Sequence, residues 1–323
     1  MYFSIVVPLY NAQKELPDLI LSVLRQSFRD FELILVNAGS RDDTWDCCRR
    51  FANADPRIKI LNVDKTTAYD AKRSGVEEAQ GTYVTVLFPD GRVKEDFLSG
   101  ISSTLKKKET DLVAYPKARE HVTTKAAPFF YADDKDDYRE LLLHENGINQ
   151  HFVGFFAKKE LYEEAFSYYH EGIQADEDDL LIFACFARAK GISFCSESLY
   201  SYDRKVYFPR PHGIDRICSE EILFQRLNVV ADDTDCSFAR PNVTRHAFLV
   251  VEKELKNIAK TKDKESFFTA FTRVVHSAFY FALKSAPAEA FDKRETRTLK
   301  RILRGRKRTA YFFMSREKEK KIR

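Results

Sequence analysis

The sequence predicts an α/β fold, in which a mostly parallel sheet is flanked by helices and followed by a helical carboxyl-terminal appendage. Strand-like and helix-like segments alternate from residue 3 to residue 107, as they do in parallel sheets. A charge-free run at 82–88 stops at Pro89-Asp90-Gly91, as a buried strand does before a sharp turn. One predicted helix carries small residues along one face, so that it can lie close on a sheet: Ala68, Ala71, Gly75 and Ala79.

Each further element follows from its own pattern. Strands are expected where β-branched, aromatic and aliphatic residues run together, at 3–8, 31–36, 58–63, 82–88 and 111–115, and those at 3–8, 31–36 and 82–88 should be buried. Helices are expected where apolar or small residues recur at helical spacing, at 15–27, after 41–44, at 68–79 and at 94–107. The apolar run 267–283 contains Arg273 and His276, so it predicts a buried amphipathic helix and not a membrane span, which needs about 20 apolar residues.

Asp90 is the first candidate functional residue. It follows a predicted parallel strand, and ligands of open α/β sheets bind at the carboxyl ends of the strands. Mg²⁺ commonly binds one or two carboxylates together with substrate phosphates, which suits a single carboxylate at this place. The alternative is that Asp90 only stabilises the turn.

Composition and charge limit the classes of protein. Six cysteines lack metal-type spacing, which is typical of a reducing compartment and argues against a disulfide framework. The amino terminus begins directly with a predicted strand, and no signal peptide is visible. These features predict a cytoplasmic protein.

The formal net charge of +4 conceals an asymmetry. Residues 293–323 hold 14 Lys or Arg against 3 Glu, a net charge of +11, so the first 292 residues sum to −7. Apolar residues and an aromatic cluster accompany these cations, and a basic amphipathic helix of this kind suits an anionic membrane surface. The alternatives are a disordered solvated tail or a helix packed on the acidic body. The chain is therefore divided into 1–212, 213–292 and a basic tail at 293–323.

Four adjacent carboxylates lie at 176–179, directly before an apolar helix. The helix macrodipole explains one or two acids at a helix amino terminus, but four adjacent carboxylates repel one another. Removing a proton from an attacking hydroxyl group requires a base, and such a base is a functional reason for the excess.

Several ordered stretches resemble the family 2 glycosyltransferases, whose fold is called GT-A. The stretches are 4–12 (SIVVPLYNA), 24–36 (LRQSFRDFELILV), 39–44 (GSRDDT), 55–58 (DPRI), 79–84 (AQGTYV), 177–178 (ED) and 199–202 (LYSY). The resemblance covers roughly residues 3–205. It implies an inverting, metal-dependent transfer of a sugar from a nucleotide-sugar donor to a hydroxyl acceptor. A glycan or lipid-linked acceptor is expected, in surface polysaccharide or teichoic-acid-like polymer synthesis.

The resemblance also implies roles for individual residues. Asp178 matches the base position, with Glu177 beside it. Asp90 matches the last aspartate of the Asp-x-Asp motif, a ligand of Mg²⁺ or Mn²⁺. His212 is a second candidate metal ligand, and the alternative is that it is a plain surface residue of a Pro-rich loop. The candidate donor-binding residues are Pro8, Tyr10, Asn37, Ala38, Ser40, Lys72 and Asp90.

The departures from the family pattern lie in the donor site. Asn37-Ala38 stands where the family has Asp-Asp, Phe88 replaces the first aspartate of Asp-x-Asp, and the Asn-x-Gly element is missing. The alternative function is therefore a non-catalytic binding or scaffold protein of the same fold. A nucleic-acid-binding protein is a further alternative because of the basic tail, but the tail lacks a recognisable reading module. An enzyme of this kind would be cytoplasmic and peripheral on the inner face of a membrane.

Overall fold

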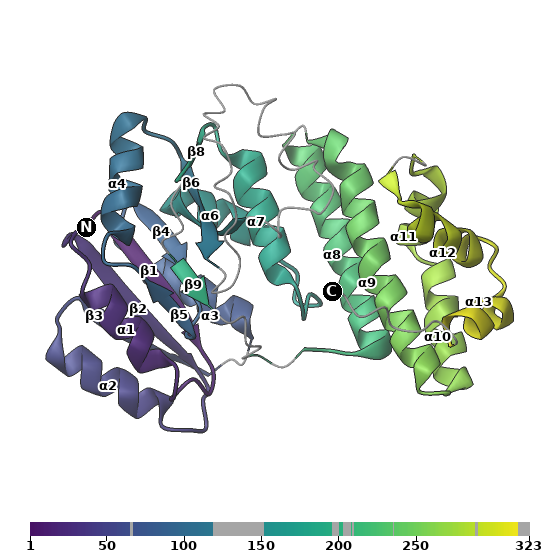
Figure 1. Ribbon diagram of the computed structural model, residues 1–323, viewed down its shortest axis with the longest axis horizontal. Helices are drawn as coiled ribbons and strands as arrows, with labels where there is room; N and C mark the ends of the chain where they lie inside the picture. The colour runs from purple at the N-terminus through teal and green to yellow at the C-terminus, as the bar shows by residue number, and fades with distance from the viewer. Residues whose placement is uncertain are drawn as a thin grey trace. The chain divides into compact units, whose positions relative to one another are not determined.

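The structure is a computed structural model that describes residues 1–64, 67–118, 152–195, 200–202, 208, 210–234, 236–287 and 290–315. These residues form two compact units (Figure 1). The sheet unit contains the described residues up to 118, 152–167 and 181–208. The helical unit contains 168–180 and the described residues from 210 to 315. Each unit is described by itself.

Four parallel strands form one half of the sheet, in the order β3-β2-β1-β4. Their bounds are β1 Phe3–Leu9, β2 Phe31–Ala38, β3 Ile58–Val63 and β4 Tyr83–Val86. Every residue of β1 and β2 is buried, because both strands lie inside the sheet. All four strands lie where the sequence predicts them.

The other half of the sheet is mixed. It contains β5 Gly91–Val93, β6 Leu112–Ala118, β7 Phe152–Lys158, β8 Ile192–Phe194 and β9 Tyr200–Tyr202. β7 runs antiparallel to both β4 and β6, and β5 runs antiparallel to β9. β8 and β9 pair with β6 in parallel. The sheet is therefore mostly parallel, as predicted.

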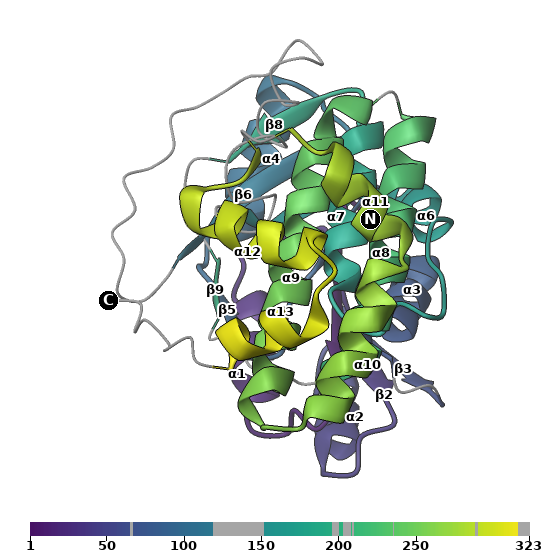
Figure 2. The ribbon, with the colours of Figure 1, turned by 90° about the vertical axis from the view of Figure 1, so that its right-hand side faces the viewer.

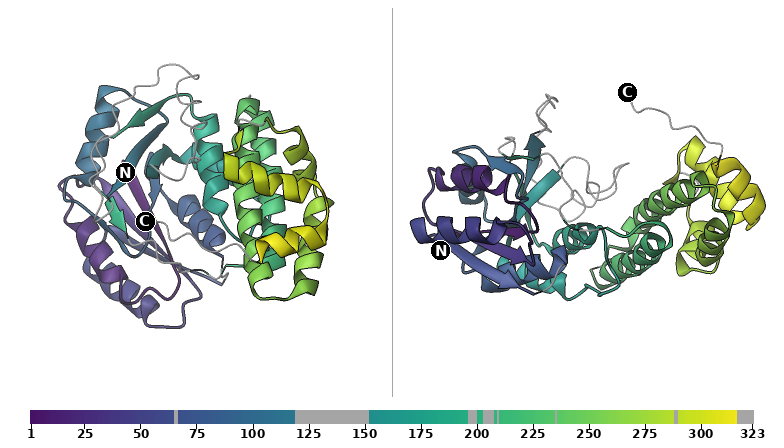
Figure 3. Two further views of the ribbon diagram at one scale, coloured as in Figure 1. Left: turned by 45° about the vertical axis from the view of Figure 1, so that its right-hand side comes forward. Right: turned by 90° about the horizontal axis from the view of Figure 1, so that it is seen from below.

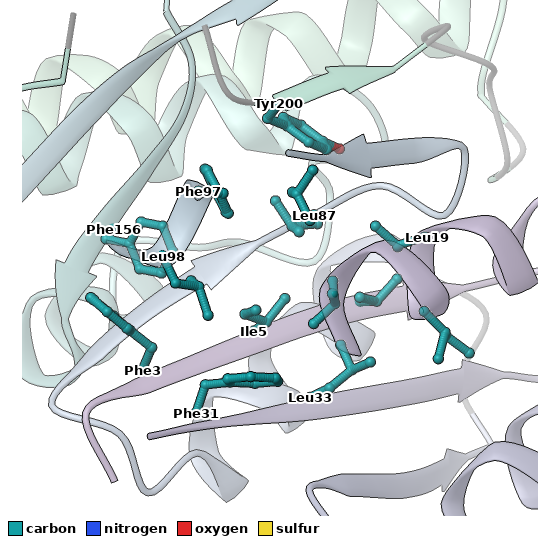
Figure 4. Packing of buried hydrophobic residues seen from close by; sticks show 14 of the residues in the cluster. Phe3, Ile5, Leu19, Phe31, Leu33, Leu87, Phe97, Leu98, Phe156 and Tyr200 are labelled. Carbon is teal, nitrogen blue, oxygen red and sulfur yellow. The ribbon is translucent and has the colours of Figure 1, made fainter. Parts of the chain in front are cut away.

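Helices flank the sheet and bury its apolar residues. They are α1 Leu16–Leu24, α2 Thr44–Ala54, α3 Ala68–Glu78, α4 Phe97–Lys107, α6 Lys159–Phe166 and α7 Glu177–Arg188. Figure 4 shows the core around Phe3, Ile5, Leu87 and Phe97, all of which are fully buried. The small face of α3 lies directly on β1 and β2. A Cβ atom at Gly75 would lie only 2.3 Å from Val6 Cγ1, so this position has no room for a side chain.

The helical unit contains the predicted appendage. Its helices are α8 Gly213–Asp233, α9 Arg240–Lys260, α10 Lys264–Val275, α11 Ala278–Ser285, α12 Lys293–Leu303 and α13 Lys307–Met314, with a short 3₁₀ turn at Ser237–Ala239. The single helix expected over 267–283 is two helices, because the Ser277 hydroxyl caps a new helix by accepting from the Tyr280 N–H. Within the described residues, no helix combines the length and apolar character that a membrane crossing needs.

The basic segment 293–314 is folded. α12 begins at a capping box between Asp292 and Glu295, and Leu299 and Ile302 are buried in the helical unit. Tyr311 of α13 packs edge-on against Phe267 of α10, with ring centroids 5.3 Å apart. For residues 293–315 the structure shows helices packed on the helical unit, one of the alternatives for the tail, and residues 316–323 of the predicted tail lie outside the described residues.

Candidate functional site

Asp90 lies in a tight turn at the carboxyl end of β4. The Gly91 N–H donates to the Phe88 carbonyl oxygen at 2.9 Å, which closes the turn. The Phe88 N–H donates to the Tyr200 hydroxyl at 2.9 Å, so β9 holds the turn in place. The Asp90 side chain is half-buried. Asp90 therefore lies at the carboxyl end of β4, where the sequence predicts a carboxylate.

Hydrogen bonds join the loops that follow β1 and β2 at the same edge of the sheet. The Ser40 hydroxyl accepts from the Asn11 N–H at 3.0 Å, and Asn11 Oδ1 accepts from the Arg41 N–H at 2.8 Å. The Thr44 hydroxyl accepts from the Ala12 N–H at 2.8 Å. Asn11 and Gly39 both adopt a positive φ, a conformation that asparagine and glycine tolerate better than other residues. Ser40 therefore shapes the loop edge, whether or not it also contacts a ligand.

Pro8 and Tyr10 occupy the end of β1. Pro8 is buried within the strand, where it pairs with Val36. The half-buried Tyr10 ring stacks on Phe208, with centroids 5.7 Å apart and an interplanar angle of 27°. A residue 198 positions away thus contacts the residue that follows β1, near the predicted donor site.

Asn37 and Ala38 form the last two residues of β2. Ala38 is fully buried, and Asn37 is 4% exposed. The Asn37 amide nitrogen donates to Asn62 Oδ1 at 2.7 Å across the β2–β3 pair. Asn37 Oδ1 is buried and accepts no hydrogen bond from the residues that the structure describes. A buried acceptor of this kind is unusual and fits a site that a ligand donor completes.

Lys72 is buried, unlike a typical lysine, which lies at the surface. Its side chain is 2% exposed, on the face of α3 that also carries Ala71 and Gly75. Burial of a lysine requires compensating partners, because an isolated ammonium group is costly away from water. The burial makes Lys72 part of the α3–sheet packing as well as a donor-site candidate.

The acidic turn before α7 belongs to the helical unit. Asp176 adopts a φ of +56°, and its carbonyl oxygen accepts from the Asp179 N–H at 2.9 Å. The buried Arg216 of α8 binds the Asp176 carboxylate, and Arg210 lies 3.4 Å from the other carboxylate oxygen. Two arginines therefore hold a residue whose backbone conformation is unfavourable for a side-chain-bearing amino acid.

Asp179 has a cationic partner of its own. His246 Nε2 of α9 lies 3.2 Å from Asp179 Oδ2 and 3.9 Å from a carboxylate oxygen of the buried Glu220. Burial alone would lower the pKa of His246, but the contact with the Asp179 carboxylate and the surrounding negative charge outweigh it and raise the pKa to about 9. Burial raises the pKa of Glu220, against the opposing effect of His246 and Arg216.

This ion cluster supplies a structural reason for two of the four adjacent acids. Asp176 and Asp179 pair with cations of α8 and α9, so their repulsion is compensated. Glu177 and Asp178 lie between them, half-buried in the first turn of α7. Asp176 and Asp179 therefore have a structural role in the turn, and the catalytic roles of Glu177 and Asp178 stay predictions.

The described residues could bind a divalent ion only if a substrate phosphate supplied further ligands. Among the described residues, no group of three or more His, Cys, Asp or Glu could hold a metal ion. His212 is exposed at the amino terminus of α8, in the helical unit. Asp90 alone suits a Mg²⁺ or Mn²⁺ ion that is shared with a diphosphate and keeps its waters, since these ions favour oxygen ligands.

The sequence did not predict several residues of this ion cluster. Arg216, Glu220 and His246 were not predicted, although Arg216 and Glu220 stand four residues apart on the buried face of a helix. Buried charges at helical spacing among apolar residues were the available signal, since such charges need partners. For Phe208 no sequence pattern indicated the contact with Tyr10.

Comparison with known sequences gives the family. Residues 4–166, about half of the chain, match the family described as Glycosyl transferase family 2. Glycosyltransferase GlyG of Streptococcus pneumoniae is 27% identical over 216 residues, which cover 62% of this chain and 70% of GlyG. The uncharacterised glycosyltransferase EpsJ of Bacillus subtilis is 27% identical over 206 residues, and the match covers 60% of EpsJ.

Comparison with solved structures gives the fold. S. aureus TarS 1–349 in complex with UDP-GlcNAc superimposes with a TM-score of 0.73 at 14% identity, covering 98% of this chain and 90% of that one. The complex of the same TarS fragment with UDP gives a TM-score of 0.64. The mostly parallel sheet with flanking helices is thus the GT-A fold, as the sequence predicted. This chain belongs to glycosyl transferase family 2.

Proposed function

We propose that this protein is an inverting, metal-dependent glycosyltransferase that moves a sugar from a nucleotide-sugar donor to a hydroxyl group of a glycan or lipid-linked acceptor. The observation that carries the proposal is the position of Asp90, a half-buried carboxylate in a tight turn at the carboxyl edge of the parallel strands. Ligands of open α/β sheets bind at this edge. The complexes of TarS with UDP-GlcNAc and UDP support a uridine diphosphate sugar as a donor of the right class.

The reaction assigns one role to each of two carboxylates. Asp178 accepts the proton of the acceptor hydroxyl as its oxygen attacks the anomeric carbon, and the bond from that carbon to the diphosphate breaks with inversion. Asp90 would hold Mg²⁺ or Mn²⁺, and His212 is a second candidate ligand. When bound, the ion stabilises the negative charge of the leaving diphosphate as a Lewis acid. Glu177 is the alternative base.

The donor site is proposed at the ends of β1 and β2. Tyr10 and Ser40 belong to the loops joined there, and Pro8 and Ala38 shape their strands. The unsatisfied Asn37 Oδ1 takes over the contact to the nucleotide base that an aspartate makes in the family pattern. Lys72 contributes positive charge beneath this edge.

The acceptor and its location extend the same proposal. A surface polysaccharide or teichoic-acid-like polymer built on a lipid carrier would bring the enzyme to the inner, cytoplasmic face of a membrane. The basic segment 293–323 would then attract it to anionic lipids, since each Lys or Arg near such a surface contributes about 1 kcal/mol.

A non-catalytic role is the second candidate. The amide nitrogen of Asn37 already donates to Asn62. Ala38 and Phe88 have no polar side chain at positions where the family pattern has aspartates. A protein that keeps the fold but binds no donor would show these features.

Donor screening by thermal shift separates the two candidates. The full chain is heated with a panel of nucleotide sugars, with and without Mn²⁺. A ligand present at 100 times its dissociation constant should stabilise the native state by about 2.7 kcal/mol. A Mn²⁺-dependent shift with one donor class supports the enzyme. If no donor shifts the transition, the scaffold role is supported and the transferase proposal fails.

A further inference from the structure

Helix α12 has two faces of opposite character. Glu295, Thr298, Leu299 and Ile302 are buried and follow one another at helical spacing. A cation stands two residues after each of these buried residues, and two residues correspond to about half a turn of the helix. The cations therefore lie on the opposite side: Arg297, Lys300, Arg301 and Arg304. The apolar face is therefore used for packing, and the face that remains outward is cationic.

Helix α13 turns this cationic face into a groove. The groove has a volume of about 260 Å³, and its lining residues are Arg297, Lys300, Arg301, Arg304, Arg306, Thr309 and Phe313. The guanidinium carbon of Arg301 lies 4.3 Å from the centre of the Phe313 ring, a cation–π contact that joins the two helices. Figures 2 and 3 show α12 and α13 beside each other in the helical unit. We call this feature the α12–α13 groove.

The charge of the groove is not neutralised by the described part of the protein. Glu295 is the one acidic residue in the sequence 293–315, and its carboxylate faces inward, 3.0 Å from Arg245 of α9. No ion pair links Arg297, Lys300, Arg301, Arg304 or Arg306 to a carboxylate among the residues whose placement is described. Five cations around one recess leave a concentrated positive potential that attracts an anion from solution.

Exposed aromatic side chains identify the kind of anion. Phe312 and Phe313 of α13 are 47% and 42% exposed, although large apolar side chains are normally buried. Cations beside exposed aromatic rings suit the boundary between phosphate headgroups and acyl chains. A soluble polyanion would use the cations but gain nothing from the exposed face of Phe312.

We propose that the α12–α13 groove binds the phosphate headgroups of anionic phospholipids and docks the protein on a membrane surface. This inference rests on the membrane location in the proposed function and names the surface that provides it. The contact is by headgroup binding with shallow aromatic insertion. Insertion of the apolar face of α12 is ruled out while the helical unit is folded, because Leu299 and Ile302 are buried inside it.

Vesicle co-sedimentation of the full chain tests the proposal. Vesicles of phosphatidylcholine with phosphatidylglycerol should bind the protein at low salt and release it at high salt, and pure phosphatidylcholine vesicles should not bind it. Each cation near an anionic surface contributes about fivefold to binding, so Lys300→Gln/Arg304→Gln should weaken it by about 25-fold. The matched control is Lys106→Gln/Lys107→Gln, which removes two cations from α4 in the sheet unit. It should bind nearly as the unchanged protein does.

Equal losses in the groove and control variants would overturn the proposal, because binding would then depend only on net charge. Undiminished binding of the groove variant would also overturn it. Phe312→Ser should weaken vesicle binding and leave binding of soluble polyphosphate unchanged. Polyphosphate binding without vesicle binding would overturn the lipid proposal and assign the groove to a soluble polyanion. Donor-induced thermal shifts are measured on the same variants, so a failure of the groove and a failure of the transferase function are seen separately.

Discussion

At the scale of single residues, Asp90 carries the metal proposal. Asp90→Asn keeps the shape of the side chain and removes the charge that would bind Mg²⁺ or Mn²⁺, so the Mn²⁺-dependent part of the donor thermal shift should disappear. The transition temperature without ligand should change little, since the turn is closed by the backbone bond from Gly91 to Phe88.

The control for this variant is Asp96→Asn. Asp96 is an exposed carboxylate at the start of α4 whose side chain makes no capping hydrogen bond. It should keep the full Mn²⁺ effect. A Mn²⁺-dependent shift that survives Asp90→Asn would remove Asp90 from the site.

Asp178 carries the proposal for the base. Asp178→Asn should leave the donor thermal shift intact and lower turnover by roughly 10²–10⁴-fold, the usual contribution of a general base. Glu177→Gln is the matched neighbour, in the same helical turn, and should have a much smaller effect. Steady-state turnover with the donor found by screening measures both. The opposite order of effects would assign the base to Glu177.

For the four adjacent acids, the sequence predicts their position in a helix but not their ion-pair partners. Their place at the start of a helix was predictable from the apolar run that follows them. The pairing of Asp176 with Arg216 and of Asp179 with His246 was not, because the partners stand 40 and 67 positions away. Local sequence shows repulsion between neighbours, but tertiary contacts decide which of the charges are compensated.

At the scale of elements, the ion cluster that joins the start of α7 to α8 and α9 predicts a pH dependence. The folded state raises the pKa of His246 from its ordinary value of 6.5 to about 9. A group whose pKa is raised by folding stabilises the protein fully below its unfolded pKa, and this contribution is lost as the pH rises through the folded pKa. His246 should therefore stabilise the helical unit at neutral pH and lose this effect between about pH 6.5 and about pH 9.

Unfolding by urea at several pH values tests this prediction. His246→Gln should be less stable than the unchanged protein near pH 6, and the difference should shrink as the pH approaches about 10. His276→Gln is the control, because His276 is exposed and its Nδ1 contacts the Thr272 carbonyl oxygen of its own helix and no carboxylate among the described residues. A difference for His246→Gln that stays constant with pH would show that the Asp179 contact does not hold the proton.

The two halves of the sheet differ in how far the sequence predicts them. The strands β1 to β4 follow from runs rich in β-branched, aromatic and aliphatic residues, which are typical of parallel strands. β5, β8 and β9 have three residues each, too few for any periodicity to appear. Their positions depend on pairing between distant residues, such as Gly91 with Tyr202.

At the scale of the whole molecule, the charge asymmetry has a structural counterpart. The sequence separates a basic tail from an acidic body, but residues 293–314 share a core with the other helices of the helical unit. Tyr280 of α11 donates its hydroxyl hydrogen to the Leu303 carbonyl oxygen at 2.9 Å. The cationic surface is thus built on a folded support, which a composition count does not reveal.

Removal of this segment should therefore damage the fold. A chain that ends at residue 292 loses the buried Leu299, Ile302 and Met314, and burial of each such side chain contributes roughly 1.5–3 kcal/mol. It also leaves Arg245 without Glu295. Calorimetry should show a lower unfolding temperature for this chain than for the full chain. An unchanged unfolding temperature after truncation at 292 would show that α12 and α13 are peripheral to the helical unit. If the temperature falls, lost vesicle binding by the shorter chain could reflect damage to the support, and substitutions within the α12–α13 groove are the cleaner test of membrane docking.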